Sequence, residues 1–183
     1  MNRVEILTSI RDNVQNENLV KHMLAVEAVM RSLAGKFSED EEEWGLTGLL
    51  HDIDVELTEG DMSFHSKMGA DLAKELGATD AMAQAILCHN ERHGVPRESL
   101  LDKALFCVDP LTGLITAAAL VRPDKKLAAV EAASVSKRFK EKSFAAGANR
   151  EQIASCQEIG LELDEFMMMG LKAMQGIADG LGL

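Results

Sequence analysis

The chain has 183 residues, of which 46% are hydrophobic and 27% are charged, and its formal net charge is −11. This length and composition predict a soluble globular protein large enough to bury a core and a pocket. The acidic balance argues against a nucleic-acid partner, because contact with a phosphate backbone requires clustered lysine and arginine side chains.

The chain begins with MNRVEILTSI, which lacks the apolar core and the small-residue cleavage site of a signal peptide. These residues instead open a short predicted helix over residues 4–14. A second helix is expected from Leu19 to about Ala34, where Gly35 would end it. The many Ala, Leu, Met, Glu and Lys residues, with only three prolines, predict an all-α protein.

A third helix is predicted where Ser38 is followed three residues later by Glu41, a spacing typical of a capping box. It is expected to run through Trp44 to about Ile53. After a polar connection, two more helices are predicted over residues 65–76 and 79–93, each followed by glycine.

Ser99 and Asp102 form the next capping-box pattern and open a long helix that reaches Val121. Pro110 is expected to kink or break this helix, because proline removes a backbone hydrogen bond. The most apolar run of this helix, residues 111–121, is about half the length of a membrane span. No membrane association is therefore expected.

The last third of the chain predicts a basic amphipathic helix over residues 125–142 and two helices over residues 150–183, split near Gly160. A methionine run, Met167 to Met169, is expected to pack in the core, with a homodimer contact as the alternative. Neither a repeat nor a linker divides the sequence, so one domain over residues 1–183 is expected. The three cysteines, in no CxxC arrangement, fit reduced thiols in a cytoplasmic protein.

Most of the five histidines are predicted to face inward. At 100° per residue, His22 lies on the apolar stripe of its helix, and His65 and His89 share faces with small or apolar residues. His51 follows the apolar residues of the third helix. One inward histidine is usually a hydrogen-bonded core residue, but several on separate helices favour a shared site.

Asp109 adds a carboxylate on an apolar and small-residue face, where an ionised group is costly unless it is paired or bound to a cation. The alternative is that Asp109 caps a helix segment beginning at Pro110. Asp102 lies in phase with Asp109, but its place in the capping box explains it better.

These residues together predict a mixed imidazole and carboxylate cluster. Imidazole ligands favour divalent transition metals over magnesium, so the expected cofactor is one or two ions of Fe, Mn, Ni, Co or Zn. The set exceeds the needs of one tetrahedral zinc, and two ions bridged by a carboxylate would use all of it. The candidate metal ligands are His22, His51, Asp52, His65, His89 and Asp109.

The order H, HD, H, H and D resembles that of the HD-domain superfamily of metal-dependent phosphohydrolases, and LLHDID is similar to its HDIG signature. The resemblance covers about residues 18–121, and residues 125–183 are expected to pack onto this core. Two further phrases, VDPLTGLI and LVRPDKK, resemble small single-domain bacterial members. The resemblance implies a helical bundle with a metal site at its centre.

By this resemblance, a first metal would be held by His22, His51, Asp52 and Asp109, and a second by His65 and His89 with Asp52 as the bridge. Some two-metal members carry a further histidine directly after the one matched by His89, and Asn90 stands there in this chain. The second site is therefore expected to be weak, loaded with a different metal or empty, and His93 is an alternative ligand for it. Asp54 replaces the glycine that closes the HDIG signature.

The implied activity is that of a hydrolase that cleaves a phosphoester of a small metabolite or nucleotide with a metal-activated hydroxide. His51 and Asp52 would be central to catalysis, and Asp54 is a candidate general acid, with a helix stop as its alternative role. Lys103, Arg92 and Arg122 are candidate substrate-binding residues, although isolated charges are more often surface groups. Two alternative functions remain open: a di-iron oxygenase with the same ligand pattern, and a metal-binding regulatory domain without turnover.

Overall fold

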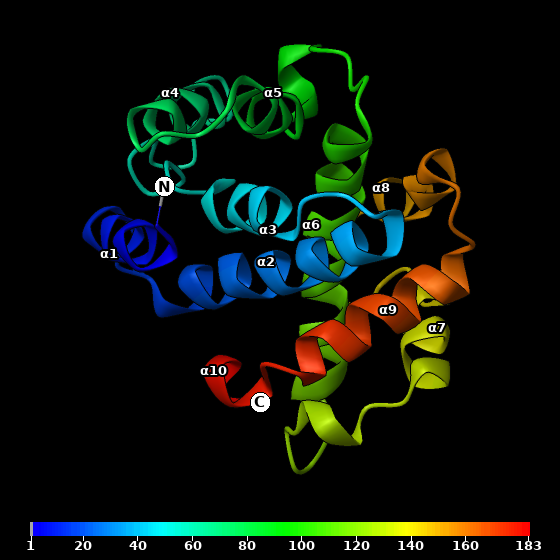
Figure 1. Ribbon diagram of the computed structural model, residues 1–183. Coiled ribbons are helices and arrows are strands. Elements are labelled where there is room, and N and C mark those ends of the chain that lie inside the picture. Colours follow the sequence, from blue (N-terminus) through cyan, green and yellow to red (C-terminus); the bar gives the residue numbers. More distant parts are fainter. Residues whose placement is uncertain (1) are drawn as a thin grey trace.

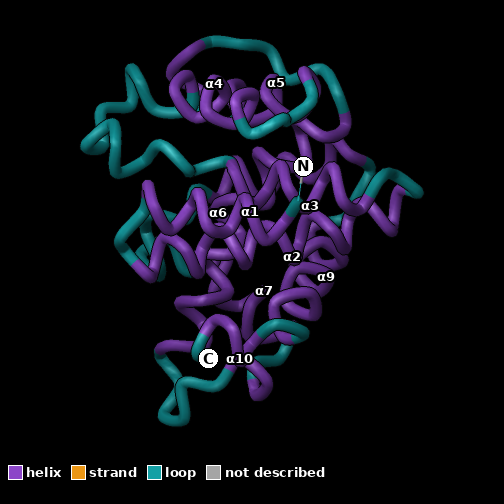
Figure 2. Tube along the Cα trace, turned by 60° about the vertical axis from the view of Figure 1, so that its left-hand side comes forward, coloured by secondary structure: helices purple, strands orange, loops and turns teal. Residues whose placement is uncertain are grey.

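Two long helices, α2 (Glu17–Phe37) and α6 (Leu100–Leu120), form the centre of the fold. They pack against each other, and α6 passes behind α2 in Figure 1. The computed structural model describes residues 2–183, and within this range the chain forms helices and turns but no strand (Figure 2). The prediction of an all-α fold is confirmed.

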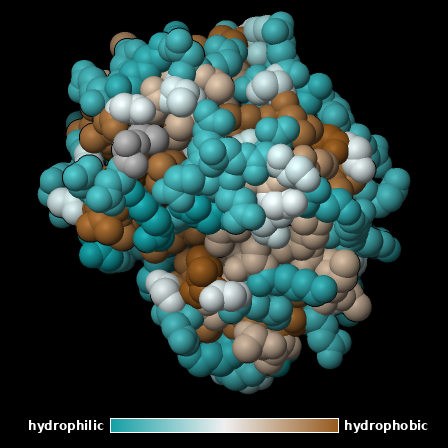
Figure 3. Space-filling model, viewed as in Figure 1, coloured by the Kyte–Doolittle hydropathy of each residue, from teal (hydrophilic) through white to brown (hydrophobic). Residues whose placement is uncertain are grey.

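The remaining helices surround this pair on two sides. On one side, α3 packs on α2, and α5 packs on both α3 and α6. On the other side, the C-terminal helices α7, α8 and α9 pack on α6. The face seen in Figure 3 is mainly hydrophilic, with apolar side chains in smaller patches. The other α-helices are α1 (Arg3–Asn13), α3 (Glu41–Leu50), α4 (Lys67–Glu75), α5 (Asp80–Cys88), α7 (Ala132–Lys140), α8 (Arg150–Ala154), α9 (Leu163–Gln175) and α10 (Ala178–Leu181), with short 3-10 turns at Glu91–His93, Leu127–Ala129 and Ser155–Ile159.

The apolar core has two parts that both use α2. The smaller part joins α2 to α1, α3, α4 and α5, and the larger joins it to α6 and the C-terminal helices. Met167 and Met174 of α9 are buried in the larger part, which confirms the core role predicted for the methionine run at Met167. The prediction is wrong for Met168, which is exposed because it lies on the outer face of α9. Cys88, Cys107 and Cys156 are free and buried, as expected.

Helix ends near the third helix differ from the prediction. Helix α2 continues through Gly35 to Phe37, and Ser38 terminates it in the left-handed conformation, with φ at 59°. The N-cap of α3 is Asp40, whose Oδ1 accepts hydrogen bonds from the backbone N–H groups of Glu42 and Glu43 at 2.8 and 3.0 Å. The predicted Ser38 capping box is therefore wrong, because the acidic run supplied a better cap two residues later.

The capping box of α6 is confirmed. Ser99 Oγ accepts from the N–H of Asp102 at 3.1 Å, and Asp102 Oδ2 accepts from the N–H of Ser99 at 2.9 Å. Pro110 does not break α6, and Asp109 lies inside the helix rather than at a cap. The carbonyl of Phe106, which would bond to residue 110 in a regular helix, instead accepts from Gln152 Nε2 at 2.8 Å.

Helix α6 is also the one helix in residues 2–183 whose length and mean hydropathy would suffice for a membrane span. Of its most apolar window, 61% is buried inside the protein, and six α-helices pack around it: α2, α3, α5, α7, α8 and α9. These contacts identify α6 as a core helix.

The C-terminal third is more broken than predicted. A 3-10 turn and the shorter α7 replace the single basic helix expected over residues 125–142. The split near Gly160 is confirmed, since Gly160 adopts a positive φ of 76° between the 3-10 turn Ser155–Ile159 and α9.

Gly48 provides a test of the packing between α2 and α3. A Cβ atom there would lie 3.1 Å from the backbone N of Glu27. This contact is costly because a backbone atom, unlike the end of a side chain, cannot rotate away. We expect Gly48→Ala to lower the free energy of unfolding by about 1–3 kcal/mol, measured by urea denaturation. Gly113→Ala in α6 is the control, because a Cβ there meets no atom within 4 Å. An equal effect of the two substitutions would contradict this packing argument.

Candidate metal centre

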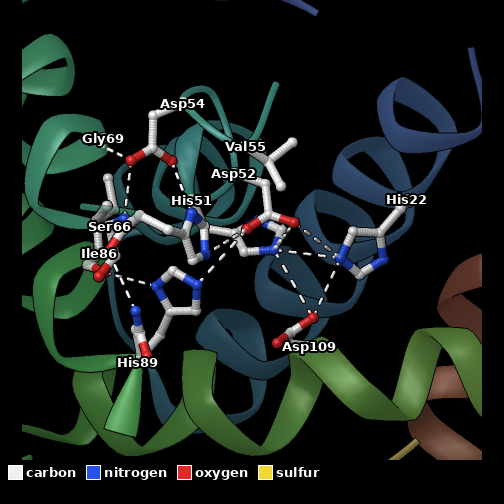
Figure 4. Close-up of polar contacts among 12 residues, drawn as sticks. His22, His51, Asp52, Asp54, Val55, Ser66, Gly69, Ile86, His89 and Asp109 are labelled. Atoms are coloured by element: carbon white, nitrogen blue, oxygen red, sulfur yellow. Dashed lines mark hydrogen bonds and ion pairs between the residues drawn. The ribbon is translucent and has the colours of Figure 1, made fainter. Parts of the chain in front are cut away.

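The carboxylate of Asp52 lies between two groups of imidazoles (Figure 4). Its Oδ2 is 3.3 Å from His51 Nε2 and 3.6 Å from His22 Nε2. Its Oδ1 is 3.5 Å from His65 Nε2 and 3.6 Å from His89 Nε2. Each oxygen of Asp52 therefore faces one pair of ring nitrogens.

Asp109 completes the group on the Oδ2 side. Its Oδ1 lies 3.1 Å from His22 Nε2 and 3.8 Å from His51 Nε2. The donor atoms of His22, His51 and Asp109 all lie within 4.8 Å of one another, as do those of His51, Asp52 and His89. His65 is outside these two compact sets; it contacts Asp52 through Nε2, and its ring lies edge-on to that of His89, with the ring centroids 5.2 Å apart.

The six residues come from five parts of the chain that meet at one point. His22 projects from the middle of α2, and Asp109 from the middle of α6. His51 and His89 occupy the C-cap positions of α3 and α5, where each helix ends next to the centre. The structure thus brings together all six candidate ligands predicted from the sequence.

Every one of the four imidazoles is held through its Nδ1 atom. His51 Nδ1 donates to the Gly48 carbonyl at 2.8 Å, and His89 Nδ1 donates to the Ile86 carbonyl at 2.5 Å. Both carbonyls belong to the last turn of the helix that the histidine ends. A carbonyl can only accept, so each of these rings carries its proton on Nδ1 when neutral.

The ring of His22 also carries its proton on Nδ1 when neutral, because Nδ1 donates to a hydroxyl that itself donates to a carbonyl. Its Nδ1 lies 3.0 Å from Thr112 Oγ1, and that hydroxyl donates its own proton to the Asp109 carbonyl at 2.9 Å. The Thr112 oxygen must therefore accept from His22. Thr112, which the sequence analysis did not single out, fixes the ring of His22 and connects it to the helix that carries Asp109.

Asp54 fixes His65 and is not placed to act as a general acid. Its side chain is fully buried, with 0% exposed, and Oδ1 accepts from His65 Nδ1 at 2.9 Å. Oδ2 accepts from the backbone N–H groups of Ser66 and Gly69, each at 2.8 Å. With its oxygens occupied and no access to solvent, Asp54 cannot protonate a leaving group, which corrects the catalytic role expected for it.

The resulting arrangement calls for a cation. With every neutral ring protonated at Nδ1, the Nε2 lone pairs converge with the carboxylate oxygens, and His22 Nε2 lies only 3.2 Å from His51 Nε2. Such lone pairs repel one another unless a proton or a metal lies between them. An ion about 2.1 Å from each donor would separate neighbouring donors by roughly 3.0–3.4 Å, close to the spacing observed. The donor set fits one or two divalent transition metals.

The pKa shifts of His51 and Asp52 in the metal-free protein also indicate that the centre calls for a cation. Burial alone would lower the pKa of His51, but the carboxylates of Asp52 and Asp109 raise it well above its ordinary value. Burial opposes ionisation of Asp52, yet His51 and its neighbours hold the Asp52 pKa well below its ordinary value. A proton on His51 thus takes the place of a metal cation.

Asn90 and His93 do not join the centre. Asn90 Nδ2 donates to the carbonyls of Met62 and His65 at 2.9 and 3.1 Å, so it braces the segment that precedes α4. His93 Nε2 lies 2.7 Å from the same His65 carbonyl, which it contacts as a donor. The alternative that His93 replaces a ligand is therefore wrong, because its Nε2 atom donates to a backbone carbonyl instead of pointing to the centre.

Three cavities share walls around the centre. One of about 360 Å³ is lined by Asp52, His65, His89, Asp109 and Gln152, among others. Asp109 also lines a second of about 360 Å³, together with His22 and the loop 145–148. His22 and Gly113 then border a third cavity of about 480 Å³. These cavities provide access to the centre from solvent.

The predicted substrate-binding cations lie elsewhere. Arg92 is exposed on the 3-10 turn after α5, and Arg122, beyond the end of α6, pairs with Asp124 at 3.1 Å. Lys103 lies in the second turn of α6, and neither it nor the arginines line the three cavities. Lys21, which the sequence analysis did not single out, lines the third cavity instead.

A larger cavity, of about 730 Å³, lies on another face of α2 and does not touch the centre. It is lined by Arg3 and Arg31, which hold the buried carboxylate of Glu27, and by the end of α9. Its size does not make it the site of chemistry, because the convergent metal-ligating groups lie around Asp52.

Comparison with known proteins identifies the domain type. A model of the HD domain matches residues 19–120. Ribonuclease Y of Oleidesulfovibrio alaskensis is 32% identical over 98 residues, or 54% of this chain and 18% of that protein. Ribonuclease Y of Desulfotalea psychrophila is 30% identical over 148 residues, or 78% of this chain and 28% of that protein. The chain thus spans less than a third of these relatives. No solved structure gives a significant match.

Asp54→Asn is expected to disable His65 as a ligand. The amide oxygen would accept from the N–H groups of Ser66 and Gly69, and the NH₂ group would then face His65 Nδ1 as a donor. The proton of His65 would move to Nε2, and affinity for a second metal equivalent should fall about 10- to 100-fold while the first equivalent still binds. Metal titration with ¹⁵N spectra of the histidines tests this. Unchanged binding of both equivalents would contradict the role assigned to Asp54.

The raised pKa of His51 predicts the pH dependence of stability. A pKa that is higher in the folded state stabilises the metal-free protein fully below the unfolded value of about 6.5, and this contribution is lost as pH rises through the folded pKa. In chelator, the free energy of unfolding should therefore decrease between about pH 6 and pH 8. With saturating Mn²⁺ or Zn²⁺ the trend should reverse, since protons compete with the metal. Rising stability in chelator over this range would contradict the prediction.

Proposed function

The chain belongs to the HD-domain family, and we propose that it is a metal-dependent phosphohydrolase that cleaves the phosphoester of a small metabolite or nucleotide. The observation that carries this proposal is the position of Asp52, with one carboxylate oxygen toward His22 and His51 and the other toward His65 and His89. This arrangement suits a carboxylate that bridges two metal ions.

A divalent metal in such a site supplies two effects: it lowers the pKa of water toward neutrality and it stabilises negative charge on phosphoryl oxygens. The side chains of the centre would hold the ions at fixed positions, because each ring is tied at Nδ1 to a helix or to Asp54. No serine or cysteine nucleophile is required. Asp109, with 28% of its side chain exposed, lies where substrate would enter.

A small substrate is favoured over RNA, although the similar proteins are named ribonuclease Y. RNA binding requires several basic groups along the path of the backbone. Among the described residues that line the three cavities, Lys21 is the one lysine or arginine. The net charge of −11 would further repel a long polyanion. We also propose that the protein acts in the cytoplasm without a membrane or nucleic-acid partner; a homodimer is a further possibility to be tested.

Metal analysis joined to activity assays tests the proposal. Protein purified with and without oxygen is analysed for metals and assayed on a panel of phosphomonoesters, cyclic phosphodiesters and short RNA. We expect bound transition metal and phosphate release from small esters in the wild type. Asp52→Ala should reduce the rate at least about 100-fold, because it removes the shared carboxylate.

Other outcomes distinguish the alternatives. Two iron ions with oxygen consumption would indicate an oxygenase, and bound metal without turnover on any substrate would indicate a regulatory domain. Cleavage of RNA but of no small ester would overturn the substrate class. Asp61→Ala is the control, since this exposed carboxylate contacts only Ser63 and should leave activity unchanged.

A further inference from the structure

Lys21 occupies the wall of the cavity next to His22. This cavity of about 480 Å³ lies between α2, α6 and the last residues of the chain, and His22 separates it from the Asp109 side of the centre. Lys21 Nζ extends toward Gly182, where an added Cβ would lie 3.1 Å from it. The lysine is therefore positioned by the fold over this cavity, one residue from a candidate metal ligand.

The charge of Lys21 is not neutralised by a neighbouring carboxylate. Lys36 pairs with Glu165 at 2.7 Å, and Lys74 pairs with Asp80 at 2.8 Å. Among residues 2–183, no carboxylate lies within 4.0 Å of Lys21. Several other lysines are also unpaired, but Lys21 is the one that lines a cavity next to the centre, and its side chain is half-buried. In a protein with net charge −11, an unpaired lysine in a cavity wall remains available to an anionic ligand.

The rest of the cavity wall is aliphatic and small. Ala117, Leu120 and Leu181 supply apolar surface, while Asn18 and Thr116 add uncharged polar groups. No phenylalanine, tyrosine or tryptophan lines this cavity among the described residues, and the one aromatic ring in its wall, that of His22, has its Nε2 atom toward Asp52 and Asp109. The cavity therefore has no large aromatic ring on which a nucleobase would stack. The cavity suits a short aliphatic group with an anionic end.

We propose that Lys21 binds a second anionic group on the leaving-group side of the substrate, which makes the substrate class an aliphatic phosphoester with two negatively charged ends. This inference rests on the proposed function. The phosphoryl group would lie at Asp52 and Asp109, and the carbon chain would pass His22 and Gly113 into the Lys21 cavity. Lys21 is thus a specificity-determining residue, separate from the six candidate ligands.

The test measures binding as well as turnover. Calorimetry of the Mn²⁺-loaded protein uses alkyl phosphates of increasing chain length that end in a carboxylate, a methyl or an ammonium group. The wild type should bind one length of the carboxylate series most tightly. Lys21→Gln should weaken that binding about 10- to 100-fold, as expected for loss of a hydrogen bond between charged groups, and should leave the methyl series unchanged.

Two further variants complete the experiment. Lys21→Arg keeps the charge and should retain most of the preference for carboxylate, and Lys172→Gln, at an exposed lysine of α9, should behave as the wild type. Equal wild-type affinity for the carboxylate and methyl series would overturn the inference, whether or not Lys21→Gln folds. So would equal weakening of all series by Lys21→Gln. Carboxylate preference without hydrolysis of any ester would sink the proposed function and leave the binding role of Lys21 standing.

Discussion

The tautomers of four buried imidazoles are the constraint on which the centre depends. Each ring binds through Nδ1 to an acceptor, and in His51 and His89 that acceptor is a carbonyl three residues earlier in the same helix. The ends of α3 and α5 thus serve as fixed supports, because their last carbonyls need donors in any case. All Nε2 lone pairs then converge on Asp52, and the arrangement is electrostatically satisfied only by protons or metal ions.

The segment between α3 and α4 is organised by the same constraint. Asp54 gathers the ring of His65 and the N–H groups that open α4, so one buried carboxylate sets both the helix start and the orientation of the ring. Asn90 holds the same segment from α5. Asp54 therefore gives this turn a defined set of hydrogen bonds, which a glycine at the same position could not provide.

The sequence was sufficient for the positions that follow helical periodicity and insufficient for those set by tertiary contacts. The inward phase of His22 and the burial cost of Asp109 could be computed, because both lie inside long helices. Asp54 lies in a turn, where no helical periodicity predicts which groups a side chain contacts. The three N–H donors that bind its carboxylate could therefore not be predicted from the sequence. Lys21 was not singled out because helical periodicity does not show which cavity a long flexible side chain reaches. The predicted N-cap of α3 was wrong because Ser38 and Asp40 are both suitable capping residues and lie only two positions apart.

Gln152 connects the C-terminal segment to the candidate metal centre by way of the backbone carbonyl that Pro110 leaves without its helical donor. Proline cannot donate to the Phe106 carbonyl, and a buried carbonyl without a donor destabilises a helix core. Gln152, from outside the matched residues 19–120, supplies the missing donor while lining the cavity beside Asp109. The same contact therefore keeps α6 continuous and fixes α8 over the site. Because Pro110 directly follows Asp109, the geometry of this candidate ligand depends on a residue far along the chain, and the C-terminal helices belong to the architecture of the centre.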